Sequence, residues 1–186
     1  KTFSEKRKLI NSANYNYPRS NIASPGLVGG PCLEKDSYIL THGMKKSEGN
    51  EFVIRARRFN ESMEKKIVKW VLSKVEYYKL NKIGISGLSF KGRPDNSDLR
   101  GSSAIGIINK LKKYDNLKIY IHDFVCDENQ LEGLGAPFEN LYDLSKKVEI
   151  LLILNNNVAY DNFDVNTLYE NLKKPKLLFD CWSIFT

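Results

Sequence analysis

Apolar residues in the first half of the chain follow the spacing of a helix. Between Glu51 and Val75 they recur at steps of three and four positions, which places them on one helical face. The positions are Phe52, Ala56, Phe59, Met63, Ile67, Trp70, Val71 and Val75. This pattern predicts a long amphipathic helix that has to bury one stripe of its surface.

The region before this helix carries weaker signals. Phe3 to Ala13 has helix-compatible composition, with Ser4 as an N-terminal cap, and Pro18 marks a stop. Residues 18–50 hold much of the glycine, proline and serine. They predict a loop with a short element around Tyr38 to Leu40.

Beyond residue 80, short apolar runs alternate with helical patterns. Strands are predicted over 82–90, 117–124, 150–154 and 176–179, and helices over 103–113, 138–147 and 165–173. Such alternation is typical of a parallel sheet that helices cover on both faces. The predicted fold class is therefore α/β, with a helical region at residues 1–80 that contains the long helix, and an α/β domain at residues 81–186.

Composition narrows the class of protein further. Of the 186 residues, 41% are hydrophobic and 27% are charged, as in an ordinary globular protein. No apolar run approaches the ~20 residues that span a bilayer, so we expect no membrane partner. The three cysteines are widely spaced and odd in number, which argues against a disulfide framework and for a reducing compartment. We expect a cytoplasmic protein.

The net charge of +7 suits an anionic ligand. The basic residues are scattered, however, and the sequence has no long Lys/Arg block, zinc-finger spacing or aromatic-basic repeat. We therefore expect no nucleic-acid partner. His42 and His122 have no metal-ligand partner at a useful spacing, so we expect no metal site and treat both histidines as structural.

A single thiol stands in a glycine-rich segment, GLVGGPCLEKD at residues 26–36. Glycines let the backbone approach a ligand closely, and the nearby ammonium of Lys35 favours the thiolate of Cys32. This arrangement is typical of a nucleophilic cysteine. A tight loop around a buried, inert cysteine explains the same residues equally well, because free cysteine is among the most buried residue types.

A second candidate site follows the first predicted strand of the α/β domain. The segment KGRPDNSDLRGSS at residues 91–103 holds three cations, two glycines and a serine pair where a helix begins. Parallel sheets bind ligands at the carboxyl ends of their strands and helix N-termini bind phosphate, so this loop predicts a phosphate contact. The alternative is a braced surface loop, with Asp95 or Asp98 paired with Arg93 or Arg100.

Three features follow one another along the chain: the cysteine loop, the long helix and a GxxFK…DxRxSS loop. Together they resemble the UDP-glucose/GDP-mannose dehydrogenase family, and the resemblance covers nearly the whole chain. The resemblance implies the later part of such an enzyme: the central dimerisation segment, then a Rossmann-like domain that holds the UDP-sugar. It also implies NAD as cofactor and a homodimer. The family's N-terminal NAD-binding domain, and the helix with its catalytic lysine and asparagine, have no counterpart here. We therefore expect no turnover by this chain alone.

The resemblance implies a chemistry as well. Members of the family oxidise the exocyclic CH₂OH of a nucleotide sugar to a carboxylate in two NAD-dependent steps. Cys32 matches the family's cysteine, whose thiolate captures the aldehyde as a thiohemiacetal and then carries a thioester. Asp36 matches a carboxylate that orients water or accepts a proton. Lys35 matches a lysine beside the dinucleotide, and Arg100 an arginine on its pyrophosphate, so Cys32, Lys35 and Arg100 are the implied cofactor contacts.

The implied substrate-binding residues follow from the same matching. They are Arg19, the loop residues Ala23, Ser24, Pro25, Gly26, Leu27, Val28 and Gly29, and the pair Phe90 and Lys91. Lys91 is the expected charge partner of the substrate. Arg19 matches an arginine that reaches the neighbouring subunit's substrate, and a plain surface arginine is the alternative for it.

The sequence departs from the family pattern at two places. The loop between Lys91 and Arg100 is two residues longer than the common spacing. The tripeptide Asp180-Cys181-Trp182 stands where many members have Asp-x-Arg, so Trp182 replaces a substrate-binding arginine. This leaves the sugar open among UDP-glucose, a UDP-N-acetylhexosamine and GDP-mannose.

Two further expectations concern the remaining cysteines and the alternative function. Cys126 and Cys181 match no family role, and we expect buried thiols at both positions. A non-catalytic nucleotide-sugar-binding or assembly module is the alternative to the enzyme. The retained Cys32, Lys35 and Asp36 favour the enzyme, because a binding module has no need of a thiol there.

Overall fold

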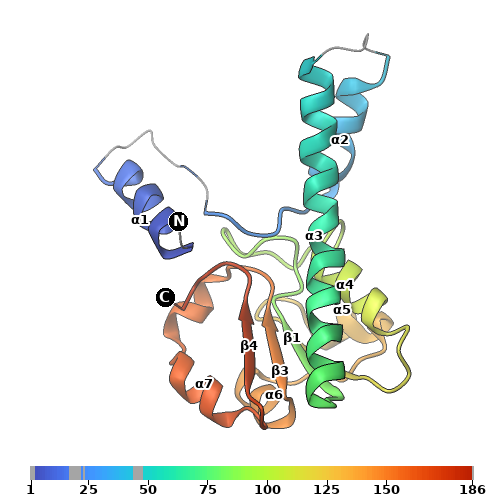
Figure 1. The fold of residues 1–186 in the computed structure, drawn as a ribbon, viewed down its shortest axis with the longest axis vertical. Helices are drawn as coiled ribbons and strands as arrows, with labels where there is room; N and C mark the ends of the chain where they lie inside the picture. Colours follow the sequence, from blue (N-terminus) through green and yellow to red (C-terminus); the bar gives the residue numbers. More distant parts are fainter. Residues whose placement is uncertain (1–2, 17–21, 23, 44–47, 186) are drawn as a thin grey trace.

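The computed structural model describes residues 3–16, 22, 24–43 and 48–185. A long helix, α3 (Glu48–Tyr78), runs along an α/β unit and extends beyond it (Figure 1). There the shorter helix α2 (Pro31–Thr41) packs beside it, and the two form a hairpin. Helix α1 (Phe3–Asn14) lies apart from this hairpin.

Four parallel strands form the sheet. They are β1 (Lys82–Ser86), β2 (Lys118–His122), β3 (Ile150–Ile153) and β4 (Leu177–Asp180), in the order β2-β1-β3-β4. All four residues of β3 are buried, as expected for a strand with helices on both faces. The α/β class that the alternating pattern predicted is confirmed.

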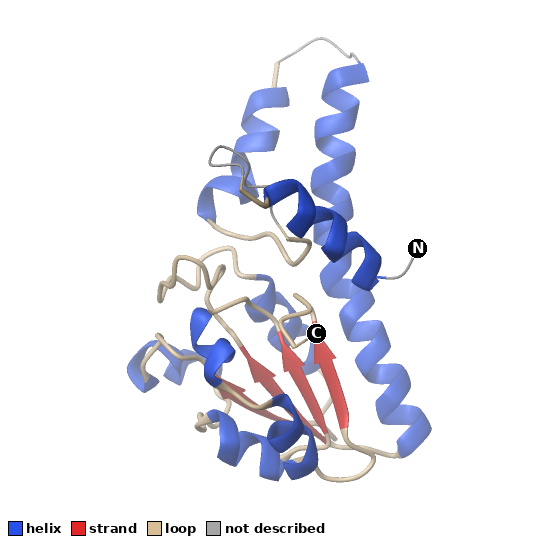
Figure 2. Cartoon of the chain, turned by 90° about the vertical axis from the view of Figure 1, so that its left-hand side faces the viewer, coloured by secondary structure: helices blue, strands red, loops and turns tan. Residues whose placement is uncertain are grey.

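Helices cover both faces of this sheet (Figure 2). Ile150 and Leu152 of β3 join a core cluster with α3 and α4 (Ser103–Leu111), whereas Leu151 and Ile153 join a second cluster with α6 (Leu141–Lys147) and α7 (Val165–Asn171). This division follows from the alternation of side chains along a strand. The sequence did not predict the short elements α5 (Glu128–Leu131), η1 (Glu132–Leu134) and η2 (Val158–Asn162).

Helix α3 confirms the long amphipathic helix. Its lower half, residues 64–78, contributes Ile67, Val68, Val71 and Val75 to the core that it shares with the sheet. Glu64 at the top of this half forms an ion pair with Lys110 of α4, with 2.5 Å between Oε2 and Nζ. The lower half is therefore fixed to the α/β unit by apolar burial and by one charged contact.

The short element predicted around Tyr38 to Leu40 lies within α2, and the prediction of a loop is wrong for the rest of this helix. Pro31 occupies the first turn of this helix, where its missing N–H is not needed, and Gly30 caps it with φ 111°. No residue of α2 is buried, so the helix lacks the apolar periodicity that would have revealed it. Its residues contact α3.

Strand β1 also differs from its prediction, because it ends at Ser86 and not at Phe90. Gly87 turns the chain with φ 84°. The backbone N–H groups of Leu88 and Ser89 then donate to Asp123 Oδ2, at 2.6 and 3.1 Å. The chain thus leaves the sheet early because a carboxylate from the end of β2 takes over its hydrogen bonding.

Candidate functional site at the carboxyl end of the sheet

The strands point towards the hairpin, so the loops that follow them lie beside α2 (Figure 2). The backbone N–H of Gly30 donates to the carbonyl of Gly101 at 3.0 Å, which joins the cysteine loop to the loop after β1. A Cβ on Gly30 would lie 2.9 Å from the Phe90 ring, and one on Gly29 would lie 2.5 Å from the Gly101 carbonyl. Glycine is therefore needed at both positions for this close packing.

Cys32 lies in the first turn of α2, directly after this contact, and is exposed. Its exposure rules out the buried, inert thiol that the sequence left open. Negative charge is stabilised at a helix N-terminus, where backbone N–H groups have no partner within the helix. The fold thus presents the thiol to solvent at the N-terminus of a helix.

Charged groups surround Cys32. Lys35 and Asp36 form an ion pair, Nζ to Oδ1 2.8 Å, and both are exposed. The pKa of Lys35 is raised by its hydrogen bond to Asp36 and, to a smaller degree, by the charge of Cys32. The pKa of Arg100 is raised by Asp98 and again, to a smaller degree, by Cys32. Two cations from separate segments therefore interact with the thiol.

Asp98 and Arg100 brace the loop after β1, as the structural alternative predicted. The guanidinium donates to both carboxylate oxygens, with Nη2 2.8 Å from Oδ2 and Nε 3.0 Å from Oδ1. These bonds lower the pKa of Asp98 to about 2. Arg93 does not pair with Asp95 or Asp98 and instead binds both oxygens of Asp161, at 2.6 and 2.8 Å.

The predicted substrate loop, residues 24–29, is held at several points. Leu27 is buried in the main core. The side-chain amide of Asn60 donates to the Val28 carbonyl at 2.6 Å and accepts from its N–H at 3.3 Å. Ser24 and Pro25 are exposed. Arg19 and Ala23, the other residues predicted to contact substrate, lie outside the described residues.

Sequence reasoning missed Asn60. Asparagine is unfavourable in a helix interior because its side chain competes with the backbone for hydrogen bonds. Its presence within the long predicted helix was the one signal in the sequence that could have indicated a role for this residue. Helix α3 thereby supplies a side chain to the loop as well as a packing surface. The long helix and the substrate loop are linked directly.

Phe90 lies against the cysteine loop, and the side chain of Lys91 contacts its ring. The Nζ of Lys91 is 5.5 Å from the centre of the Phe90 ring, a cation–π contact. The Phe90 N–H donates to the Asp98 carbonyl at 3.1 Å, which closes the loop back on its own start. The structure thus brings Phe90, Arg100 and the Gly29-Gly30 turn together.

A buried carboxylate that the sequence did not single out organises this end of the sheet. Besides the N–H groups of Leu88 and Ser89, Asp123 accepts from Val125 and Cys126, at 2.9 and 3.1 Å. One side chain therefore satisfies four backbone donors from two loops. It fixes the starts of both loops relative to each other.

The remaining cysteines and the buried histidine behave as structural groups. Burial raises the pKa of Cys126 to about 12 and that of Cys181 to about 11, where a hydrogen bond with the Leu27 backbone opposes the rise. Cys126 is fully buried and Cys181 is half-buried. Burial lowers the pKa of His122 to about 4, and its Nδ1 lies 2.8 Å from Ser86 Oγ.

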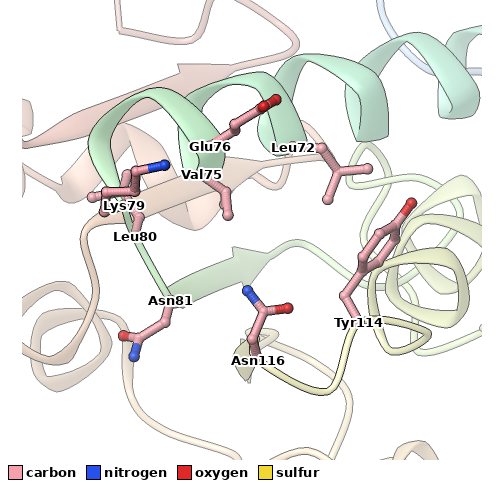
Figure 3. A pocket seen from close by; sticks show the side chains of 8 residues that line it. All are labelled: Leu72, Val75, Glu76, Lys79, Leu80, Asn81, Tyr114 and Asn116. Atoms are coloured by element: carbon pink, nitrogen blue, oxygen red, sulfur yellow. The ribbon is translucent and has the colours of Figure 1, made fainter.

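Two cavities mark opposite ends of the α/β unit. One of about 280 Å³ lies beside the site and is lined by residues of α2, α3 and α4, among them Glu34, Arg57 and Asn60. A larger one of about 570 Å³ lies between the C-terminal end of α3 and the amino ends of β1 and β2, with Leu72, Val75 and Leu80 at its wall (Figure 3). The larger cavity is thus remote from every candidate site residue.

Within the described ranges, no helix has both the length and the apolar character needed to cross a bilayer. The same residues hold no group of three or more histidine, cysteine or acidic side chains arranged to bind a metal ion.

The fold and site define an α/β domain of the Rossmann type, carrying a helical extension whose cysteine loop closes over the carboxyl end of the sheet. The model of the UDP-glucose/GDP-mannose dehydrogenase family, UDP binding domain, matches residues 84–186. The chain belongs to this family.

Curated relatives agree with this assignment. Protein CapL from Staphylococcus aureus is 34% identical over 168 residues, which cover 87% of this chain and 37% of CapL. A UDP-N-acetyl-D-glucosamine 6-dehydrogenase from Pseudomonas aeruginosa is 29% identical over 130 residues, 64% of this chain and 30% of that protein. The chain therefore spans well under half the length of these relatives.

Solved structures share the fold. The UDP-D-ManNAc dehydrogenase from Pyrococcus horikoshii superimposes with a TM-score of 0.75 at 22% identity, covering 97% of this chain and 41% of that one. The UDP-N-acetyl-mannosamine dehydrogenase Cap5O from Staphylococcus aureus gives 0.66 at 24% identity, covering 96% and 39%. Both α3 and the α/β unit fall within these matches.

Proposed function

We propose that this chain is the substrate-holding part of an NAD-dependent UDP-sugar dehydrogenase and supplies the thiol for its second oxidation. One observation carries the proposal: the Gly29-Gly30 turn packs on Phe90 and Gly101, and this contact holds the exposed Cys32 at the carboxyl end of β1. Ligands of open α/β sheets bind at that edge.

The residues around Cys32 suit the two-step oxidation. Its thiolate attacks the aldehyde carbon of the sugar to give a thiohemiacetal, and the oxidised product is a thioester that water hydrolyses. Asp36 lies one helical turn after Cys32 on the same face of α2, from where a carboxylate orients that water. Lys35 forms an ion pair with Asp36 and holds its carboxylate in place.

The donor set also fits NAD. Arg100 and Lys35 are cations whose pKa values respond to Cys32, and both suit a pyrophosphate. When bound, NAD would accept hydride in each oxidation. Within this chain, Arg100 and Lys35 would hold the cofactor next to the thiol, and Asp98 would orient the guanidinium. We expect the rest of the cofactor site in the part of the relatives that this chain does not cover.

Titration calorimetry with UDP tests the substrate part of the proposal. Lys91→Ala should weaken binding by roughly 1.5–3 kcal/mol, because it removes a charge-assisted contact. Lys113→Ala is the matched control, since it removes one lysine charge near the opposite end of the sheet. If the two substitutions weaken binding equally, Lys91 contributes only to the net charge and does not contact UDP. Wild-type protein that fails to bind UDP would contradict the proposal.

We also propose that two copies pair through the hairpin. The large apolar side chains Leu33, Ile39, Leu40, Phe52 and Phe59 are exposed on α2 and on the upper half of α3, residues 48–63. An exposed apolar surface of this kind marks an interaction site, and a two-fold dimer is the commonest closed assembly. The expectations of a homodimer and of a cytoplasmic protein both stay proposals.

A further inference from the structure

Trp182 follows β4, and its ring is fixed from two strands. The indole Nε1–H donates to the carbonyl of Leu154, the residue after β3, at 2.9 Å. Its backbone N–H donates to Asp180 Oδ1 at 3.0 Å, and the other oxygen of that carboxylate accepts from the N–H of Phe185 at 3.0 Å. The ring therefore has a defined position at the carboxyl end of the sheet.

The face of this ring lies against Gly26 of the substrate loop. A Cβ added to Gly26 would lie 2.2 to 2.3 Å from three atoms of the indole, well inside the ~3.5–4.0 Å of a normal carbon–carbon contact. Gly26 does not have a positive φ, so its backbone conformation is open to other residues. Glycine is required here by the indole and not by the backbone.

The neighbouring Cys181 strengthens the same contact. Its thiol is half-buried and forms a hydrogen bond with the Leu27 backbone, while the Leu27 side chain joins the core. The segment after β4 thus touches two successive residues of the loop. Asn60 of α3 holds the third, Val28, by two hydrogen bonds.

We propose that Trp182 is a positioning residue that holds the substrate loop in its ligand-binding conformation before substrate arrives; this rests on the proposed function of the loop. The side chain acts through Gly26 and makes its own polar contact inside the protein, to Leu154. An arginine at this position would offer its charge to the substrate, whereas the indole offers a rigid apolar surface to the loop. A pre-ordered loop lowers the entropy that binding has to overcome.

A double-mutant cycle tests the contact. Gly26→Ala alone should speed amide hydrogen exchange of residues 26–30 about tenfold in the ligand-free protein, because the new methyl group displaces the loop from the indole. Trp182→Ala alone should have a similar effect. In the Trp182→Ala background, Gly26→Ala should add nothing, since the ring that it would strike is gone.

Gly29→Ala is the matched control. It places a methyl group in the same loop, but against the Gly101 carbonyl at 2.5 Å, which Trp182→Ala cannot relieve. Its effect should therefore be the same in both backgrounds. Trp182→Phe keeps a ring over Gly26 but removes the hydrogen bond to Leu154. Gly26→Ala should therefore still speed amide exchange of the loop in the Trp182→Phe background.

The affinity for UDP separates positioning from plain stability. Gly26→Ala and Trp182→Ala should each weaken UDP binding about tenfold while exchange in β3 stays at the wild-type rate. If Gly26→Ala has as large an effect in the Trp182→Ala background as in the wild type, or if the affinity is unchanged while the loop exchanges faster, the proposal is wrong. Wild-type protein that does not bind UDP would contradict the proposed function, and the exchange cycle would still decide whether Trp182 holds the loop.

Discussion

The two halves of α3 show the same apolar stripe in two different environments. In the lower half Ile67 and Val71 are 3% and 0% exposed, because the sheet and α4 cover them. In the upper half Phe52 and Phe59 are 73% and 63% exposed, and α2 beside them contains no buried residue. The stripe continues past the end of its partner within the chain. One helix therefore carries exposed apolar side chains in its upper half and contributes to the core in its lower half.

Removing core side chains from the lower half should have the largest effect. Ile67→Ala should lower the free energy of unfolding by about 2–5 kcal/mol, because it leaves a cavity in a packed core. Phe52→Ala, measured in dilute monomeric protein, should change it by less than about 0.5 kcal/mol. Urea denaturation followed by circular dichroism gives both values. If the two substitutions lower the free energy of unfolding equally, the two halves of α3 do not differ in their contribution to stability.

Acid should destabilise the α/β unit through its buried histidine, His122. Burial lowers the pKa of His122 from 6.5 to about 4, so between these pH values the unfolded chain binds a proton that the folded chain does not. Stability is therefore complete above about pH 6.5 and falls by roughly 3 kcal/mol as the pH approaches 4. Asp98, with a pKa of about 2, adds its own loss only at lower pH.

Unfolding midpoints between pH 8 and pH 4 measure this slope. His122→Asn should flatten it, because it removes the buried imidazole. A slope that survives His122→Asn would assign the acid response to other groups.

The two thiols Cys32 and Cys126 should differ in their reactivity towards an alkylating reagent. Cys32 is exposed on the hairpin, whereas Cys126 is buried in the α/β unit with its pKa raised to about 12. Iodoacetamide should label Cys32 at least about a hundred times faster than Cys126, because only the thiolate reacts. Mass spectrometry of a labelling time course measures both rates, and equal rates would remove Cys32 as the candidate nucleophile.

The upper half of α3 should govern self-association. Phe59→Glu should weaken a dimer about tenfold or more, because it places a charge in an apolar contact, while the helical circular dichroism stays unchanged. Sedimentation at several concentrations measures the change, and Tyr77→Glu at the other end of α3 is the exposed control. Weak protein dimers form at about tens of micromolar protein. Wild-type protein that remains monomeric at that concentration would refute the dimer.

Elements with strong periodicity were predictable, and those held by a few contacts were not. The stripe from Phe52 to Val75 predicted α3, and the buried run around Ile150 predicted β3, because burial demands a regular apolar pattern. Helix α2 buries nothing and left no such pattern. Strand β1 was predicted too long because its end is set by Asp123, far away in the sequence.

For the site, the sequence by itself determined which residues are present, namely a thiol behind two glycines and the cations Lys35 and Arg100, and it indicated the family to which they belong. Only the tertiary structure decided how they meet. It exposed Cys32 at a helix start, joined Gly30 to Gly101, and placed Asn60 against Val28 and Trp182 against Gly26 of the substrate loop. The physical reason is that local patterns report burial and backbone preference, whereas contacts between residues far apart in the sequence arise only when the core has packed.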